Sequence, residues 1–123
     1  MQRIGIDIIE IERIERAIIR WGDSFLRRIY TDAEISAYGS RPPSLAARFA
    51  GKEAVMKLLG SKGPGWREIE ILSRPEGEPY VQLYGRAQSE AGRLGFKEIA
   101  ISLSHSKEYA IASVAAVSAP KSH

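Results

Sequence analysis

Two acidic side chains stand in apolar stretches of the sequence, where a carboxylate needs a partner. Asp7 lies in the run IGIDII, and Glu53 lies in RFAGKEAVMKLLG. A carboxylate facing a core must be paired, hydrogen-bonded or bound to a metal ion, because burying its bare charge is costly. Without cysteine or clustered histidine, oxygen ligands favour a hard cation such as Mg2+, which takes one or two protein carboxylates together with water and substrate phosphate. Asp7 and Glu53 are therefore candidates for a metal site used in phosphate chemistry.

Both acids also have a structural interpretation. Asp7 is compatible with a hydrogen-bonded aspartate at the end of a strand, and Glu53 with an ion pair to Lys57, one helical turn further on. Lys52 falls in the same apolar arc of the helix, and the sequence alone does not assign it. His105 falls at a corner between two expected strands, where a surface turn histidine is the alternative to a site residue.

The first elements follow from a change of hydrophobic period. Alternation over residues 4–9 predicts a strand with Asp7 on one face and the isoleucines 4, 6 and 8 on the other. Residues 10–21 then follow a helical period, with Gly22 as a stop signal. Opposite the apolar side of this helix lie Arg13, Arg16 and Arg20, a basic stripe whose alternative interpretation is a solvated face partly neutralised by nearby glutamates.

The remaining elements are read in the same way. Residues 23–30 predict a short helical stretch that adds Arg28, and TDAE at 31–34 predicts a capping box that opens a helix to Tyr38. Ser44 is the expected cap of a long helix that ends near Gly60 and contains Gly51, where a glycine would allow a close approach. Then come a loop at 60–65, a hairpin at 66–84, a helix at 85–94 and strands at 98–104 and 108–117. This order predicts an α+β domain with an antiparallel sheet packed on one side by helices.

Composition limits the class of protein. The chain has 123 residues, which suits a single domain spanning 1–123, and its 44% apolar and 27% charged residues are those of a soluble globule. The net charge of +3 is modest and interleaved, so we expect no nucleic-acid partner. No run of about eighteen apolar residues and no signal-peptide pattern occurs, which predicts a cytoplasmic protein without a membrane partner. The loop at 60–65 lacks the phosphate-loop pattern of nucleotide hydrolases.

Several motifs together resemble one family. These are GIDIIEIERI at 5–14, TDAE at 31–34, RFAGKEAVMKLLG at 48–60, WREIEI at 66–71 with GEPYV at 77–81, and SLSHSKEYAIASV at 102–114. The sequence resembles the holo-acyl-carrier-protein synthases, the small bacterial members of the 4'-phosphopantetheinyl transferase superfamily. The resemblance covers almost the whole chain.

The resemblance implies a fold, a reaction and a set of site residues. It implies a Mg2+-dependent transfer of 4'-phosphopantetheine from coenzyme A to a serine of apo-acyl carrier protein, releasing 3',5'-ADP, in support of fatty acid biosynthesis. The metal ligands would be Asp7 and Glu53, which with Lys57 form the catalytic set. The coenzyme A contacts would be Arg48, Lys57, Gly60, Gly63, His105 and Ser106. The serine proton would go to Glu53 or to a metal-bound water, and the sequence does not choose between them.

The family also implies partners. Its members dock an acidic carrier protein against the first helix. The resemblance therefore implies that the carrier protein binds a basic patch on this chain, formed by Arg13, Arg16, Arg20 and Arg28. Small bacterial members are homotrimers with active sites at subunit boundaries. Two other functions stay open on the residues alone: a non-catalytic basic adaptor for an acidic protein, and a magnesium-dependent nucleotide phosphohydrolase. The sequence does not identify the carrier protein, the use of acyl-coenzyme A or the metal bound in the cell.

Overall fold

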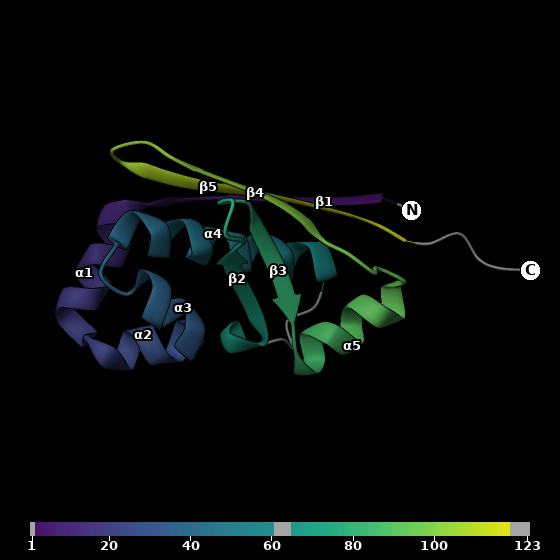
Figure 1. Ribbon diagram of the computed structural model, residues 1–123, viewed down its shortest axis with the longest axis horizontal. Helices are drawn as coiled ribbons and strands as arrows, with labels where there is room; N and C mark the ends of the chain where they lie inside the picture. The colour runs from purple at the N-terminus through teal and green to yellow at the C-terminus, as the bar shows by residue number, and fades with distance from the viewer. Residues whose placement is uncertain (1, 61–64, 119–123) are drawn as a thin grey trace, which may run out of the picture.

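The structure is a computed structural model that describes residues 2–60 and 65–118, and it has an α+β architecture (Figure 1). The described elements are, in chain order, β1 (Gln2–Glu10), α1 (Ile11–Trp21), α2 (Asp23–Ile29), α3 (Asp32–Tyr38), α4 (Pro42–Leu59), the 3-10 turn η1 (Trp66–Glu68), β2 (Ile69–Ser73), β3 (Pro79–Leu83), α5 (Gly85–Leu94), β4 (Ala100–His105) and β5 (Tyr109–Val117). The predicted class and the order of strand, helices, hairpin, helix and hairpin are confirmed.

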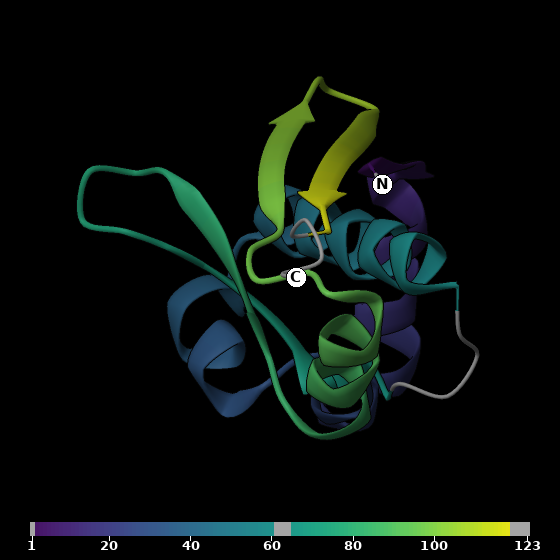
Figure 2. The ribbon, with the colours of Figure 1, turned by 90° about the vertical axis from the view of Figure 1, so that its right-hand side faces the viewer.

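The strands form two antiparallel sheets, where the sequence predicted one. The first strand pairs with the last, giving a three-stranded sheet in the order β1-β5-β4, while β2 and β3 form a separate two-stranded sheet. The two hairpins extend in different directions (Figure 2). Alternation along each strand indicates which faces are buried, but pairing between distant strands is not a local property of the chain. The division into two sheets was therefore not readable from the sequence.

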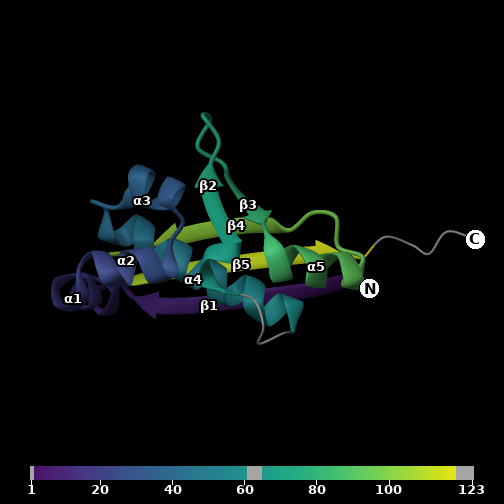
Figure 3. The same ribbon diagram turned by 90° about the horizontal axis from the view of Figure 1, so that it is seen from below.

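Helix α4 covers one face of the three-stranded sheet, lying along β1 and β5 (Figure 3). Small residues permit this approach: β5 turns the buried side chains of Ala110 and Ala112 toward the core, and β1 contributes Gly5. On its other side α4 packs against β2. The Ile71 side chain of β2 comes so close to Gly51 that a Cβ atom placed at Gly51 would lie 2.6 Å from the Ile71 Cδ1 atom. The expectation that Gly51 allows a close approach is confirmed, and α4 is enclosed on most of its surface.

No helix among the described residues covers the opposite face of the three-stranded sheet (Figure 1). Ile4, Ile6 and Ile8 of β1 point to this side and are 68%, 61% and 56% exposed. Asp7 is on the inner face of the same strand, with Gly5 and Ile9. An exposed apolar strip of this kind on a sheet is typical of a contact surface.

The helix ends match the predicted signals with one exception. Gly22, Gly39, Gly60 and Gly95 follow α1, α3, α4 and α5, and the capping box of α3 is present, with Thr31 and Glu34 bonded reciprocally. The prediction of Ser44 as the cap of α4 is wrong. The helix begins at Pro42 after Arg41, because proline fits the first helical turn, where its missing N–H is not needed. No helix within residues 2–60 and 65–118 has the length and apolarity to span a bilayer.

Candidate functional site

Asp7 and Lys57 meet where β1 crosses α4. The Lys57 ammonium donates to Asp7 Oδ1 at 2.8 Å and to the Ile6 carbonyl at 3.2 Å. The Asp7 side chain is 16% exposed and that of Lys57 is 57% exposed, so the pair lies at the edge of the core, open to solvent on the lysine side. The hydrogen bond from Lys57 to Asp7 raises the pKa of the lysine. The alternative of an ion pair between Glu53 and Lys57 is wrong, because Lys57 reaches across to the strand.

Glu53 lies one turn before Lys57 on the same helix and faces the same site. Burial raises the pKa of its carboxyl group, and the nearby Asp7 charge raises it further, while Lys57 and Arg13 oppose the shift. In the described part of the chain Glu53 forms no ion pair or hydrogen bond through its carboxylate, whereas Asp7 is paired. Asp7, Glu53 and Lys57 therefore form one cluster, called here the acid–lysine cluster, with two carboxylates opposed by a single ammonium.

The acid–lysine cluster has the donor set of a hard divalent cation that is shared with a substrate. Two carboxylates from different elements supply oxygen ligands, and their mutual repulsion is relieved when a cation binds. Residues 2–60 and 65–118 contain no group of three or more histidine, aspartate or glutamate side chains placed to hold a metal. A cation at this site would thus keep positions for water and phosphate, as Mg2+ commonly does.

Lys52, left unassigned by the sequence, has a different environment from its neighbour Glu53. Its side chain is fully buried and forms an ion pair with Glu34 of α3 at 2.7 Å. The two charged residues in the apolar arc of α4 therefore serve different sites, Lys52 toward α3 and β2 and Glu53 toward β1. The signal that could have found the partner is the capping box, since its glutamate is one of the few acids placed to face the core.

Arg48 lies on the side of α4 that faces β2, away from the acid–lysine cluster. It is buried, donates to the Ile71 carbonyl at 3.2 Å and to Ser73 Oγ at 2.9 Å, and stacks over the Tyr38 ring at 3.6 Å. Burial lowers the pKa of its guanidinium. Within one copy of the chain, no hydrogen bond or ion pair of the described residues joins Arg48 to Asp7 or Glu53.

The other predicted coenzyme A contacts fall in two places. Gly60 ends α4 with a φ of 68°, one turn after Lys57, so it borders the acid–lysine cluster. His105 is the exposed last residue of β4, and Ser106 opens the turn into β5, where its Oγ accepts from the Tyr109 N–H at 3.2 Å. This turn confirms the predicted corner. Gly63 lies outside the described residues.

The predicted basic patch is exposed on α1 and α2. Arg13, Arg16, Arg20 and Arg28 are all exposed, and Arg13 is near enough to Glu53 to lower its pKa. Arg16 pairs with Glu12 at 2.7 Å. Sequence reasoning missed an apolar component beside these charges: Ile19 and Trp21 are 85% and 57% exposed. The signal was available for Ile19, which falls beside the stripe that contains Ile11 and Ile14. Trp21, seven residues after Ile14, falls on that stripe but is the last residue of α1.

Comparisons with known proteins agree with this geometry. Residues 3–114 match the family described as the 4'-phosphopantetheinyl transferase superfamily. A holo-[acyl-carrier-protein] synthase of Dehalococcoides mccartyi (strain CBDB1) is 58% identical over 113 residues, which cover 91% of this chain and 95% of the relative. One from Herpetosiphon aurantiacus is 46% identical, covering 89% and 94% of the two chains.

A solved structure extends the likeness to three dimensions. The crystal structure of Helicobacter pylori holo-[acyl-carrier-protein] synthase in complex with coenzyme A matches with a TM-score of 0.84 and 32% identity, covering 93% of this chain and 99% of that one. The relatives found by sequence and the one found by structure are thus proteins of the same kind, and each likeness covers nearly the whole chain. The chain belongs to the 4'-phosphopantetheinyl transferase superfamily.

Proposed function

We propose that this chain transfers the 4'-phosphopantetheine group of coenzyme A to a serine of an apo-acyl carrier protein and releases 3',5'-ADP, in support of fatty acid biosynthesis. The observation that carries the proposal is the meeting of Asp7 and Glu53, from β1 and α4, beside the Lys57 ammonium. The relatives named holo-[acyl-carrier-protein] synthase and the Helicobacter pylori structure with coenzyme A support it. The adaptor and phosphohydrolase alternatives have no comparable support.

The residues of the acid–lysine cluster fit a Mg2+ ion. Asp7 and Glu53 would hold it, because two carboxylates from different elements face one place, and the Glu53 carboxylate has no hydrogen-bond or ion-pair partner of its own among the described residues. When bound, the ion would supply positive charge to the coenzyme A diphosphate.

Lys57 would bind and neutralise the departing nucleotide. Its contacts with Asp7 and with the Ile6 carbonyl fix the ammonium, while more than half of the side chain remains accessible to a diphosphate. Charge stabilisation and positioning of this kind dominate phosphoryl transfer. We therefore assign Lys57 to the charge that develops on 3',5'-ADP.

In the reaction the serine oxygen bonds to the phosphorus that carries pantetheine, and the bond from that phosphorus to the leaving 3',5'-ADP breaks. The serine proton requires an acceptor. Glu53 faces the site without a hydrogen-bond or ion-pair partner among the described residues, and a water held by a carboxylate is the other candidate. We propose that one of these two groups accepts this proton.

The substrate site would be completed by a second copy of the chain. Within one copy, no hydrogen bond or ion pair of the described residues joins Arg48, His105 or Ser106 to the acid–lysine cluster, whereas Gly60 follows Lys57 by three residues at the end of α4. The uncovered apolar strip of Ile4, Ile6 and Ile8 gives a surface on which copies can associate. We propose a homotrimer in which Arg48, His105 and Ser106 of one copy approach coenzyme A held by the acid–lysine cluster, Gly60 and Gly63 of its neighbour.

The carrier protein would dock on α1 and α2. Carrier proteins of this kind are acidic, and the exposed arginines 13, 16, 20 and 28 form the matching positive patch. Such charges raise the association rate and make it sensitive to salt. The cytoplasmic location and the single domain over residues 1–123 stay predictions from the sequence.

The direct test measures the mass of the acceptor. The protein is incubated with coenzyme A, Mg2+ and an apo-acyl carrier protein, and the intact carrier is analysed by mass spectrometry. We expect a gain of one phosphopantetheine group that is lost when a chelator is added. An unchanged mass with several types of carrier protein would overturn the proposal.

Two controls separate the alternative functions. The variant Asp7→Ala combined with Glu53→Ala should leave the carrier unmodified, whereas a non-catalytic adaptor would be unaffected by it. Release of 3',5'-ADP measured without any carrier should stay near background. Release at the full rate without carrier would instead indicate a nucleotide phosphohydrolase.

A further inference from the structure

A fully buried ion pair lies next to the acid–lysine cluster but outside it. Lys52 of α4 and Glu34 of α3 are 2.7 Å apart, and neither side chain is exposed to solvent. Two charges taken out of water are stabilising only when the remaining hydrogen-bonding groups are also satisfied. The other hydrogen bonds of Lys52 and Glu34 therefore decide whether this buried pair stabilises the fold.

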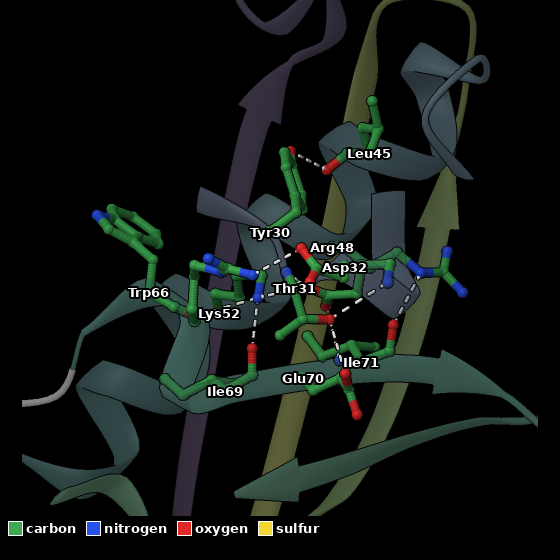
Figure 4. Close-up of polar contacts among 12 residues, drawn as sticks. Tyr30, Thr31, Asp32, Leu45, Arg48, Lys52, Trp66, Ile69, Glu70 and Ile71 are labelled. Atoms are coloured by element: carbon green, nitrogen blue, oxygen red, sulfur yellow. Dashed lines mark hydrogen bonds and ion pairs between the residues drawn. The ribbon is translucent and has the colours of Figure 1, made fainter. Parts of the chain in front are cut away.

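Every donor of the Lys52 ammonium is used. Besides Glu34, it donates to the Trp66 carbonyl at 3.1 Å and to the Ile69 carbonyl, as Figure 4 shows for the labelled residues. An ammonium has three N–H donors, so these contacts complete its capacity. Lys52 thus ties α4 to the 3-10 turn η1 and to the first residue of β2.

Glu34 is equally committed. One carboxylate oxygen accepts from the Thr31 N–H at 2.8 Å and from Lys52, and the other accepts from the Ile71 N–H at 2.8 Å. The same side chain closes the capping box of α3 and holds the middle of β2. The described part of the chain has no buried side-chain nitrogen or oxygen without a hydrogen-bond partner, so this hub is fully satisfied.

The hub fixes α4 at the residue immediately before Glu53. On the side of β2 the helix is held through Lys52, and on the side of β1 it is held through Lys57, which contacts Asp7 and the Ile6 carbonyl. Successive side chains on a helix point about 100° apart, so fixing Lys52 also fixes the direction of Glu53. An apolar pair of the same volume would fill the space but would not set this rotation by directional bonds.

We propose that Glu34 and Lys52 are positioning residues that set Glu53 against Asp7 and thereby tune divalent-cation binding without touching the ion. This proposal rests on the metal site of the proposed function. It predicts that disturbing the buried pair weakens cation binding in protein that is still folded. A purely structural pair would lower stability and leave the affinity of folded protein unchanged.

The test uses two variants of the full chain. Glu34→Gln combined with Lys52→Met removes both charges, which avoids a lone buried charge, and glutamine can still serve a capping box. Glu34→Asp keeps both charges but withdraws the carboxylate by one methylene, so it preserves the fold if the double variant does not. The matched control is Glu90→Gln, which makes the same Glu-to-Gln change at a partly buried acid that pairs with Arg93 on α5.

Mn2+ binding in the presence of coenzyme A and without carrier protein is measured by electron paramagnetic resonance, below the unfolding temperature of each variant. We expect the Mn2+ Kd to rise about tenfold in the double variant, as for other residues that orient a metal ligand, and in the same direction for Glu34→Asp. The Glu90→Gln control should bind Mn2+ as the unaltered protein does.

Equal Mn2+ affinity in folded positioning variants and in the unaltered protein would overturn the proposal while leaving the metal site intact. Loss of Mn2+ binding in Asp7→Ala establishes that the measured site is the acid–lysine cluster. If the unaltered protein binds no Mn2+, or if Asp7→Ala binds it normally, the metal site itself fails and the positioning proposal fails with it.

Discussion

Gly5 of β1 lies so close to Ala54 of α4 that a Cβ atom at position 5 would stand 2.4 Å from the Ala54 carbonyl oxygen. Asp7 is on the same face of β1, two residues further on, and Glu53 immediately precedes Ala54 in the helix. The close contact between Gly5 and the Ala54 carbonyl therefore sets the distance between β1 and α4, and with it the separation of Asp7 and Glu53.

Gly5→Ala should push β1 away from α4. The added methyl group meets backbone, which has little room to adjust, so we expect a loss of about 1–3 kcal/mol in the free energy of unfolding. Transfer activity of the folded fraction should fall as well, because Asp7 and Glu53 move apart. Denaturant unfolding and the mass assay measure the two effects. Gly92→Ala is the control, since a Cβ there meets no atom within 4 Å; a loss of stability that is equal in both variants would contradict the close-contact account.

Lys57→Ala should impair turnover far more than folding. An ion pair whose lysine is 57% exposed contributes at most about 1 kcal/mol to stability. Loss of a positioned charge at a transferring phosphoryl group, by contrast, lowers kcat about a hundredfold or more. The comparison is Arg93→Ala, which breaks an exposed pair with Glu90 on α5 and should leave kcat unchanged. Parallel small losses in stability and kcat for Lys57→Ala would reduce Lys57 to a structural ion pair.

Much of the fold could be predicted because its signals are local. The glycine stops after α1, α3 and α5 and the capping box at Thr31 and Glu34 each depend on a few adjacent residues. The start of α4 was misplaced because two prolines look like a break, although proline is well suited to a first turn. The grouping of strands into two sheets depends on distant pairing and was not predictable locally.

The candidate site shows the same limit. Motif resemblance identified Asp7, Glu53 and Lys57, and the structure brings them together. The partner of Lys57 was missed because a helical wheel compares only residues of the same helix, whereas Asp7 lies on the strand β1. The role of Lys52 was missed for a related reason: a wheel assumes one buried face, but α4 is enclosed by β1 and β5 on one side and by β2 on another.

Reversing charges on α1 should weaken carrier docking. For Arg16→Glu combined with Arg20→Glu we expect the KM for the carrier protein to rise about tenfold and its dependence on salt to flatten, with kcat little changed. Arg93→Glu on α5, combined with Lys97→Glu just after it, makes the same change in net charge and should alter neither value. Helix α5 lies at the end of the molecule opposite α1 (Figure 1). Unaltered salt dependence in the α1 variant would remove this helix from the docking surface.

Glu53→Gln should stabilise the metal-free protein at neutral pH. A raised pKa means that the ionised carboxylate is less favourable in the folded chain than in the unfolded one, and the amide removes that penalty. The sign fixes the pH dependence: the advantage of the variant should shrink as pH falls through the pKa of Glu53, where the unaltered side chain becomes neutral. Denaturant unfolding in the presence of a chelator measures the difference in the free energy of unfolding between Glu53→Gln and the unaltered protein. The control is Glu76→Gln, at an exposed glutamate. A less stable Glu53→Gln at neutral pH would contradict the predicted penalty that burial and the Asp7 charge place on the ionised carboxylate.

Two variants that are each defective should restore activity when mixed, if neighbouring copies share a site. Asp7→Ala damages the acid–lysine cluster of one copy, and His105→Ala damages the turn proposed to reach its neighbour. Random assembly of equal amounts leaves about one quarter of the shared sites with both halves intact. Co-refolded mixtures should therefore recover about a quarter of the activity, and Ile6→Glu in both chains should abolish the recovery by charging the apolar strip. No recovery in mixtures shown to exchange subunits would place the whole site within a single copy.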